Sequence, residues 1–415
     1  MRLSLTVLRR HAPICVAALL SGLYGWALLA ATLSGHDGTI GLGFNALGAD
    51  WIIGQEAARA VLAHQGAHIY DQSWITHMVN RDYAAWLSRP LPYPIFPYPP
   101  VSLLIVTPFA LLPMPLSSLA FQLLTFIALA VALRKLSDDR GTWSFLLIGV
   151  LASASAAINM AAGQNGYLVG ALLVGGFALL DAAPVAAGIV LGLLLFKPQF
   201  LPLAVVALVA MKSFRALAAM AATMVAAVFL SLLLFGADLW WAWANSFLHP
   251  GLGTGINGNV WGHMWDSTVS TCLSLLGAPP WAATAGQAAA ILISLVLVWR
   301  TFRSPARLTT KLGVLLCATL LASPHLSSYD MILLTVAALI AVAELRPDAG
   351  PLAFFLPLAA YAAPIYDPPR YNALGLVTPL VLLGLASWFY VKAFSGGTQA
   401  TLSATDGLKP SYPGN

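Results

Sequence analysis

A succession of apolar runs limits how this chain can fold more than any other feature of its sequence. A transmembrane helix needs about 20 mainly apolar residues, and lipid offers the backbone no hydrogen-bond partners, so a spanning segment has to satisfy its own. Of the 415 residues, 59% are hydrophobic and 8% are charged, against about 25% charged residues in soluble domains. Runs that span or nearly span fall at about 12–33, 116–135, 143–161, 166–181, 184–197, 199–212, 215–236, 281–300, 308–323, 330–345, 351–365 and 372–393. The sequence therefore predicts an all-α polytopic membrane protein with about twelve transmembrane helices.

One further apolar run, residues 101–111, is too short to cross about 30 Å of hydrocarbon as a helix. It is framed and interrupted by prolines, namely Pro99, Pro100, Pro108, Pro113 and Pro115. We predict that it is a re-entrant or interfacial segment.

The Lys and Arg residues predict which side each loop occupies, because short cytoplasmic loops carry an excess of basic residues. With the N-terminus inside and 101–111 not crossing, fifteen of the twenty basic residues are cytoplasmic. The exceptions are Arg59, Arg81, Arg89, Lys197 and Arg370. If 101–111 spanned, every later loop would change sides and this bias would be lost. We therefore expect a multi-pass protein of the plasma (inner) membrane with both termini in the cytoplasm.

This topology divides the chain into one transmembrane domain, residues 1–393, and a disordered cytoplasmic tail, residues 394–415. Within the domain, residues 34–98 form a large first extracytoplasmic loop and residues 237–280 a second one. The first apolar run is longer than the roughly 7–15 residues of a signal-peptide core, so we expect an uncleaved helix. The net charge of +5 follows from the basic cytoplasmic loops and does not indicate a nucleic-acid partner.

Lys197 stands in the apolar run "GLLLFKPQFLPLAVV", at the joint of two short predicted helices. A lysine at the centre of a membrane helix costs about 3 kcal/mol on insertion scales. Two interpretations are open: the side chain extends to the interface, or it binds an anion in a cavity where Pro198 breaks the helix.

The first outer loop contains the other candidate groups. Residues 49–62 have amphipathic helical spacing and Asp50 stands at the start, where it acts either as an N-cap or as a catalytic carboxylate. His64, His68 and His77 leave a metal site open, although no HExxH-type pattern accompanies them.

Polar residues from distant parts of the chain reach the same predicted face. They include Gln164, Asn165, His325, Tyr329, Asp330, Asp367, Arg370 and Asn372. The inner loops are short and basic, and "GLGFNALG" lacks the strand–GxGxxG–helix setting of a dinucleotide site. Any chemistry therefore faces outward and does not use cytosolic nucleotide directly.

Four stretches occur in order between about residues 48 and 220. They read "GADWIIGQEAARAVLAHQGAHIYD", "YPPVSLLIVTPFALLPMPLSSLAF", "GQNGYLVGALLVGGFALL" and "AAGIVLGLLLFKPQFLPLAVVALVAMKSFRA". Together they resemble glycosyltransferase family 87, whose members have the GT-C architecture, and "SPHLSSYD" is a weaker match. The resemblance implies inverting transfer of a sugar, commonly mannose, from a polyprenyl phosphate donor to a lipid or glycan acceptor on the extracytoplasmic side.

The resemblance also implies roles for individual residues. Asp50, in "GADW", matches the acidic residue of the first outer loop that acts as the base. Gln164, Asn165 and Lys197 match motifs that bind the donor phosphate or sugar, and His325 or Arg370 makes a second phosphate contact. No cofactor is implied. A divalent metal stays open, because this loop has "GAD" alone, with Asp71 and Asp82 further on, where many GT-C members have an Asp-x-Asp pair.

Two other functions remain open from the sequence. Broken helices with a buried charge also mark the substrate sites of transporters and lipid flippases. The chain is alternatively a non-catalytic partner in the assembly of envelope polysaccharide.

Overall fold

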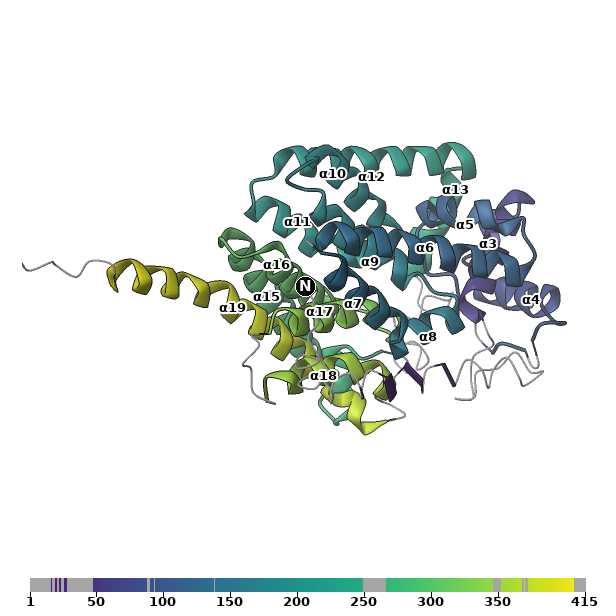
Figure 1. Ribbon diagram of the computed structural model, residues 1–415. Helices are drawn as coiled ribbons and strands as arrows, with labels where there is room; N and C mark the ends of the chain where they lie inside the picture. Colours follow the sequence, from purple (N-terminus) through teal and green to yellow (C-terminus); the bar gives the residue numbers. More distant parts are fainter. Residues whose placement is uncertain are drawn as a thin grey trace, which may run out of the picture.

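The computed structural model describes residues 48–87, 90–92, 94–137, 139–248, 266–345, 352–367, 369 and 372–406, together with residues 16, 19–20, 22–23 and 26–27. In this part of the chain every regular element is a helix (Figure 1), as predicted. Most of the predicted first helix, 12–33, lies outside the described residues, and so do residues 34–47 of the first outer loop.

The helices follow one another with short connections. The α-helices are α3 (Ala49–Leu62), α4 (Gln72–Asp82), α5 (Leu103–Ala110), α6 (Met114–Leu136), α7 (Arg140–Leu151), α8 (Ala154–Ala162), α9 (Gly166–Ala178), α10 (Pro184–Gly192), α11 (Leu201–Ala210), α12 (Phe214–Phe235), α13 (Ala237–Leu248), α14 (Val269–Leu275), α15 (Pro280–Arg303), α16 (Leu308–Ala322), α17 (Ile332–Ala343), α18 (Leu352–Tyr366) and α19 (Thr378–Asp406). Short 3₁₀ helices are η1 (Gly66–His68), η2 (Pro100–Ser102), η3 (Leu193–Phe196), η4 (Pro198–Phe200), η6 (Ser328–Met331) and η7 (Ala373–Val377). Every apolar run predicted after residue 100 coincides with one helix or with a pair of them.

Fewer helices are long enough to span than the sequence predicts. Four pass on length and composition in the described residues: α6, α12, α15 and the η7–α19 segment up to Ser395. The pair α7 and α8 makes a fifth if it is one span, bent by 54° at residues 152–153. The other apolar helices have 10–17 residues. The structure therefore supports a membrane protein with four or five candidate spans, and the predicted twelve are not confirmed.

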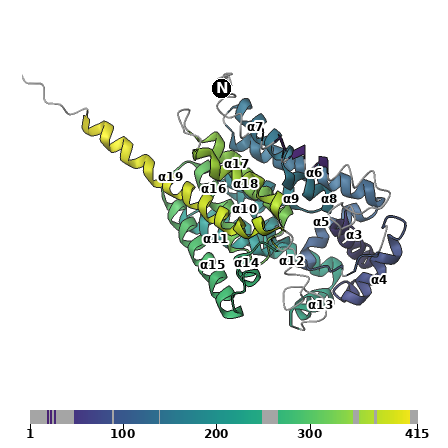
Figure 2. The same cartoon turned by 90° about the horizontal axis from the view of Figure 1, so that it is seen from below.

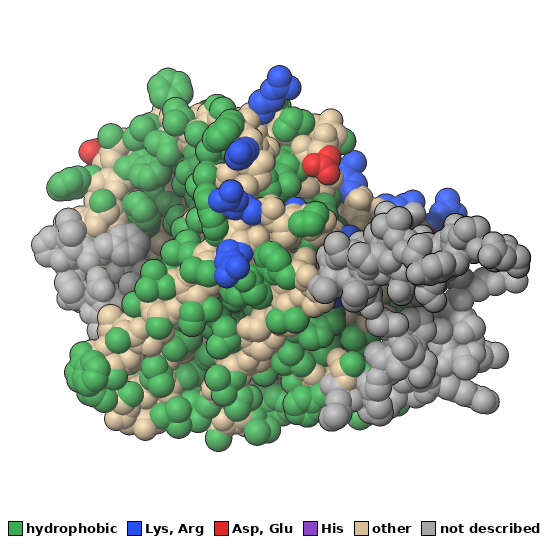
Figure 3. Space-filling model, turned by 90° about the vertical axis from the view of Figure 1, so that its left-hand side faces the viewer, with side chains coloured by type: hydrophobic (Ala, Val, Ile, Leu, Met, Phe, Trp, Pro, Cys, Tyr) green, Lys and Arg blue, Asp and Glu red, His purple; other side chains and the backbone are tan. Residues whose placement is uncertain are grey.

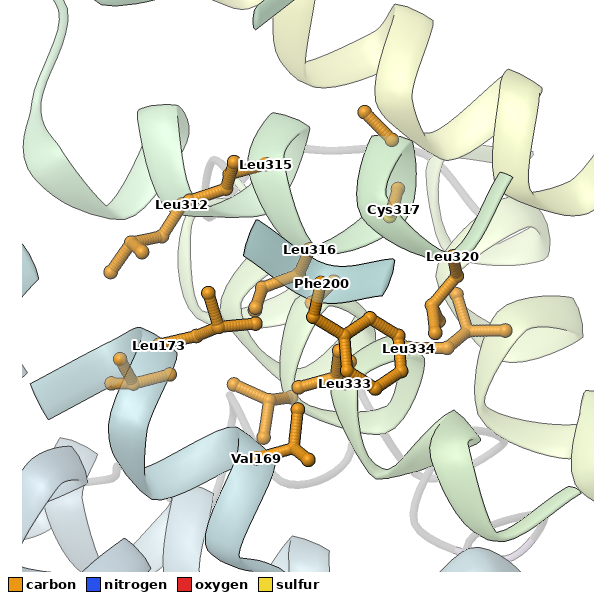
Figure 4. Packing of buried hydrophobic residues seen from close by; sticks show 14 of the residues in the cluster. Val169, Leu173, Phe200, Leu312, Leu315, Leu316, Cys317, Leu320, Leu333 and Leu334 are labelled. Carbon is orange, nitrogen blue, oxygen red and sulfur yellow. The ribbon is translucent and has the colours of Figure 1, made fainter. Parts of the chain in front are cut away.

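The bundle packs around α16 and α17, whose side chains are almost all buried. Helices α9, α15 and α19 surround them, and Val169 and Leu173 of α9 lie in one buried cluster with Leu316 and Leu333 (Figure 4). Phe200, from η4, enters the same cluster beside Leu333 and Leu334. The chain immediately after Lys197 is thus anchored in the core of the bundle.

Helices α10 and α12 lie side by side because glycines let their backbones approach. A Cβ added at Gly188 would lie 2.1 Å from the carbonyl oxygen of Ala216, and one at Gly192 would lie 2.7 Å from the Cβ of Thr223. Small residues four apart are a common way for membrane helices to pack closely. The outer face of α12 exposes Val225, Phe229 and Leu233, as expected of a helix in contact with lipid.

A smaller unit of α3, η1, α4, η2 and α5 covers one end of the bundle (Figures 1 and 2). It has its own apolar core, to which α13 contributes Leu239. The C-terminal end of α5 is capped by α3: Gln55 donates to the carbonyl of Leu112 at 2.8 Å, and Arg59 donates to that of Ala110 at 3.0 Å. The short segment 101–111 is thus an apolar helix held by the first outer loop, and its re-entrant path stays a prediction.

The opposite end of the bundle is basic. Figure 3 views the molecule from that end and shows several Lys and Arg side chains above a largely apolar surface. Arg134 and Lys135 lie in the last turn of α6, and Arg300 and Arg303 in the last turn of α15. The side of the membrane that this basic end faces stays a prediction. Helix α19 continues to Asp406, past the predicted start of a disordered tail at residue 394, and projects from the bundle (Figure 1).

Candidate active site

The start of α3 is joined to the break between α8 and α9. The N–H of Gly48 donates to the carbonyl of Ala161 at 2.6 Å. Gly163 has a φ of 72°, and a Cβ there would lie 2.5 Å from the Cβ of Trp51, so this contact needs a glycine. Gly48, not Asp50, is the N-cap of α3, and no side chain caps this end. The N-cap interpretation of Asp50 is therefore wrong, and its carboxylate is free for other contacts.

Asp50 is hydrogen-bonded to the Gln-Asn motif. The Nε2 of Gln164 donates to Oδ2 of Asp50 at 2.6 Å. The hydroxyl of Tyr98 donates to Oε1 of Gln164 at 3.2 Å and accepts from Nδ2 of Asn165 at 3.3 Å. Asp50, Gln164 and Asn165, which the sequence predicts as site residues, thus lie in one chain of contacts with Tyr98, which it does not.

Two further amide side chains, those of Gln122 and Asn159, hold the segment that contains Gln164 and Asn165 in place. The Nε2 of Gln122 donates to the carbonyl of Gln164 at 2.7 Å, and Nδ2 of Asn159 donates to Oε1 of Gln122 at 2.8 Å. Oδ1 of Asn159 accepts from the N–H of Gly166, the first residue of α9, at 2.8 Å. Both side chains are buried, so the break between α8 and α9 is held in one conformation.

A cavity opens in front of this chain. It encloses about 440 Å³ of space, part of it open to solvent. The polar side chains that line it are Asp50, Tyr98, Ser102, Gln164 and Asn165, and the apolar lining includes Trp51, Phe96, Ile105, Phe121, Leu168 and Phe196. Trp51 and Phe121 are stacked with ring centroids 4.5 Å apart. The cavity therefore has one polar wall and one largely aromatic and aliphatic wall.

Lys197 lies at the break between η3 and η4, as predicted, but it does not extend to the interface. Its Nζ is 2.7 Å from Oδ1 of Asp330, and the side chains are 2% and 0% exposed. The ammonium also lies 5.1 Å from the ring centre of Tyr329 and 5.5 Å from that of Phe200. The sequence shows Asp330 in "SPHLSSYD" but not its pairing with Lys197, so the ammonium is less free than the sequence suggested.

His325 is paired in a similar way. Its Nδ1 is 2.5 Å from Oδ1 of Asp266, which also accepts from the N–H of Leu326 at 3.2 Å. Desolvation lowers the pKa of His325, but the hydrogen bond and the negative charge of Asp266 raise it by more, to above the ordinary value. No sequence motif marks Asp266, so it was not among the predicted site residues.

These groups act on one another electrostatically. Burial raises the pKa of Asp50, while Gln164, Lys197 and His325 lower it and Asp330 raises it. Asp50, Lys197 and His325 therefore lie close enough to interact, although they come from different parts of the chain and only Asp50 lines the cavity. We call this group of residues the polar chamber.

Three other predictions have different outcomes. Arg370 lies outside the described residues. Asp367 is buried near His325, and neither of its oxygens has a hydrogen-bond partner of normal geometry. No group of three or more His, Cys, Asp or Glu side chains in the described part of the chain is arranged to hold a metal ion. His64, His68 and His77 are exposed.

The all-helical fold, its apolar surface and this polar chamber define a polytopic membrane protein with a built internal site. The model of glycosyltransferase family 87 matches residues 96–324, more than half of the chain. The protein belongs to this family and is a membrane glycosyltransferase, which confirms the resemblance seen in the sequence. The match contains Gln164, Asn165 and Lys197 and leaves Asp50 and His325 outside. No curated protein and no solved structure matches the chain.

Proposed function

We propose that the enzyme transfers a hexose, specifically mannose, from a polyprenyl phosphate to a hydroxyl of a lipid or glycan acceptor. The reaction takes place on the extracytoplasmic side of the plasma membrane and inverts the anomeric centre. One observation carries the proposal: the half-buried Asp50 carboxylate lies at a cavity, is oriented by Gln164 and interacts electrostatically with Lys197 and His325.

Asp50 is the general base in this mechanism. Its carboxylate accepts the proton of the acceptor hydroxyl as that oxygen bonds to C1 of the donor sugar. The C1–O bond to the phosphate breaks on the opposite face, and its electron pair leaves with the polyprenyl phosphate. Gln164 holds Oδ2 of Asp50, so the other oxygen, to which no described residue donates, takes the proton.

Lys197 and His325 stabilise the charge that grows on the leaving phosphate. Asp330 occupies one of the three N–H donors of Lys197, which leaves two for phosphate oxygens. His325 keeps its proton more readily than an ordinary histidine because of Asp266. Such charges are worth more in a site that excludes water, where screening is weak. Membership in a glycosyltransferase family favours this reaction over transport or a purely structural role in polysaccharide assembly.

The test is a transfer assay on the purified protein in lipid nanodiscs, with polyprenyl-phosphate-mannose as donor and an alkyl mannoside as acceptor. We expect a product with the wild type and a loss of about 10²- to 10⁴-fold with Asp50→Asn, the usual contribution of a general base. Asp82→Asn is the matched control, because Asp82 pairs with Arg81 on the surface of the smaller unit that also contains α3. Wild-type turnover by Asp50→Asn would remove Asp50 from the mechanism.

A further inference from the structure

In the chain of hydrogen bonds that begins at Asp50, the donor and the acceptor of each bond can be derived from the Asp50 carboxylate. An ionised carboxylate only accepts, so Gln164 turns its amide nitrogen to Asp50 and its oxygen to Tyr98. Burial raises the pKa of Tyr98, which keeps its proton and donates it to that oxygen. The Tyr98 oxygen then accepts from the nitrogen of Asn165. The last group in the chain, Oδ1 of Asn165, is left without a donor.

The structure leaves this oxygen unsatisfied. Oδ1 of Asn165 is buried and has no hydrogen-bond partner. Buried polar atoms in native proteins are almost always paired, so an orphan beside a cavity calls for a group that enters from outside. Asp50 lines the same cavity, and Gln164 holds only one of its two oxygens, Oδ2. The cavity is thus lined by a carboxylate and by an amide whose oxygen has no donor.

The cavity lacks the groups that a phosphate needs. Neither Lys nor Arg nor His is among the described side chains that line it. The cations of the chamber, Lys197 and His325, lie outside the lining and are each paired with a carboxylate. An anionic donor head group is therefore poorly matched to this space, whereas a neutral group with several hydroxyls fits it.

From these contacts we propose that the cavity is the acceptor subsite, and that it selects a polyhydroxylated, amphipathic acceptor by two hydroxyls. One hydroxyl, the nucleophile, donates to Oδ1 of Asp50, and a second donates to Oδ1 of Asn165. The apolar part of the acceptor packs on the wall formed by Trp51, Phe96 and Phe121. The inference rests on the proposed function and changes one sequence-based assignment, because it places Asn165 on the acceptor and not on the donor phosphate.

The first experiment measures binding without turnover. Octyl α-D-mannoside, below its micelle concentration, is the probe in saturation-transfer NMR on the protein in nanodiscs. We expect its ring protons to receive saturation from the wild type, and the affinity to fall at least tenfold in Asn165→Leu. Gln65→Leu, which removes an exposed amide of the outer unit, is the control and keeps wild-type affinity. Equal binding by Asn165→Leu and wild type, or no binding by either, would overturn the inference.

The second experiment identifies the hydroxyl that Asn165 binds, with single-deoxy analogues of octyl mannoside as acceptors. We expect the wild type to use one analogue at least tenfold less well than the parent, apart from the analogue that lacks the nucleophile. Asn165→Leu should lose that discrimination and raise the KM for the acceptor but not for the donor. Tyr98→Phe, which removes the link to Asn165 and keeps the ring, should shift both readings in the same direction.

The two proposals fail in different ways. If the wild type binds the probe and Asn165→Leu does not, but no transfer product forms, the proposed reaction is wrong and the hydroxyl subsite stands. If transfer occurs and Asn165→Leu raises the KM of the donor alone, the reaction stands and the subsite assignment is wrong. A variant that does not fold is recognised by its thermal unfolding, and Tyr98→Phe then carries the test.

Discussion

The ion pair of Lys197 and Asp330 permits a prediction that separates stability from catalysis. The two side chains are almost completely buried, with Nζ and Oδ1 2.7 Å apart. Removing one partner of such a pair leaves an uncompensated charge inside the protein and typically costs about 3–5 kcal/mol. Total stabilities are about 5–15 kcal/mol, so Lys197→Met and Asp330→Leu should each be strongly destabilised.

The magnitude follows from what each variant leaves behind. In Lys197→Met, the Asp330 carboxylate keeps only a long contact from the N–H of Ser327, at 3.4 Å. In Asp330→Leu, the ammonium loses its ion-pair partner and keeps the faces of Tyr329 and Phe200, worth about 0.5–2 kcal/mol, together with the more distant charge of Asp50. The double variant Lys197→Met/Asp330→Leu buries no charge, so its stability should return to within about 2 kcal/mol of the wild type.

Denaturant unfolding of the four proteins in detergent closes a double-mutant cycle. We expect a coupling energy of at least about 4 kcal/mol, because single losses of about 3 kcal/mol each add to about 6 and the double variant loses about 2. The transfer assay then asks a different question, because the double variant is stable but has no ammonium. We expect it to be inactive. The matched control is Lys392→Met: Lys392 pairs with Glu344 at 3.0 Å, but its side chain is 35% exposed, so the loss should be within about 1 kcal/mol. Additive single variants, or a double variant with full activity, would refute this reasoning.

Three further predictions concern the pH response and the packing. Burial raises the pKa of Asp50, and a general base acts in its ionised form, so kcat/KM should rise with pH through a midpoint above 3.8. Gln164→Leu removes a hydrogen bond that lowers this pKa, so the midpoint of its pH–rate profile should move to higher pH. Burial also raises the pKa of Asp367 well above its value in the unfolded chain, so the native state binds the extra proton and stability falls as pH rises, by up to about 1.4 kcal/mol per pH unit. Asp367→Asn should remove that slope, and a stability difference that does not change with pH would contradict this explanation. Gly188→Ala places a methyl 2.1 Å from the carbonyl oxygen of Ala216 and should cost about 1–3 kcal/mol in unfolding experiments.

The positions of the helices could be predicted from the sequence, but their role as spans could not. The apolar run 116–135 falls on α6, and the run 143–161 falls on α7 and α8. Hydrophobicity records that a segment is buried from water and does not distinguish lipid from the interior of a protein. Helix α16 is as apolar as a span, yet it has 15 residues and is buried by its neighbours. The predicted twelve crossings are not confirmed for this reason, and four or five candidate spans are supported in the described residues.

For the site, the sequence predicted several of the residues but not the pairs that they form. The similarity to a family selected Asp50, Gln164 and Lys197, and the first two lie in contact although 114 residues separate them. The partner of Lys197 was missed because nothing local links it to Asp330, 133 residues away on the connection between α16 and α17. Tyr98 was missed because a tyrosine among prolines is also typical of a membrane interface. Only the folded structure, in which α3 contacts α8 and Tyr98 is hydrogen-bonded to Gln164 and Asn165, shows that its hydroxyl lies between two amides.

Lys197 and His325 are each paired with a carboxylate, and this pairing is compatible with a reaction in which negative charge grows on the phosphate. The reason is that the total charge of the site is the same before and after the reaction. In the proposed reaction, Asp50 carries one negative charge at the start and the donor phosphodiester carries another. After the proposed transfer, Asp50 holds the acceptor proton and is neutral, and the released phosphate monoester carries both charges. The proposed reaction therefore moves one negative charge from Asp50 toward the phosphate. Lys197 and His325, fixed in place by Asp330 and Asp266, interact with Asp50 before the transfer and have no large reorganisation to make during it. A cation that is held by its own carboxylate is better suited to this transfer of charge than an unpaired one. An unpaired cation would form an ion pair with the ionised Asp50 in the resting enzyme.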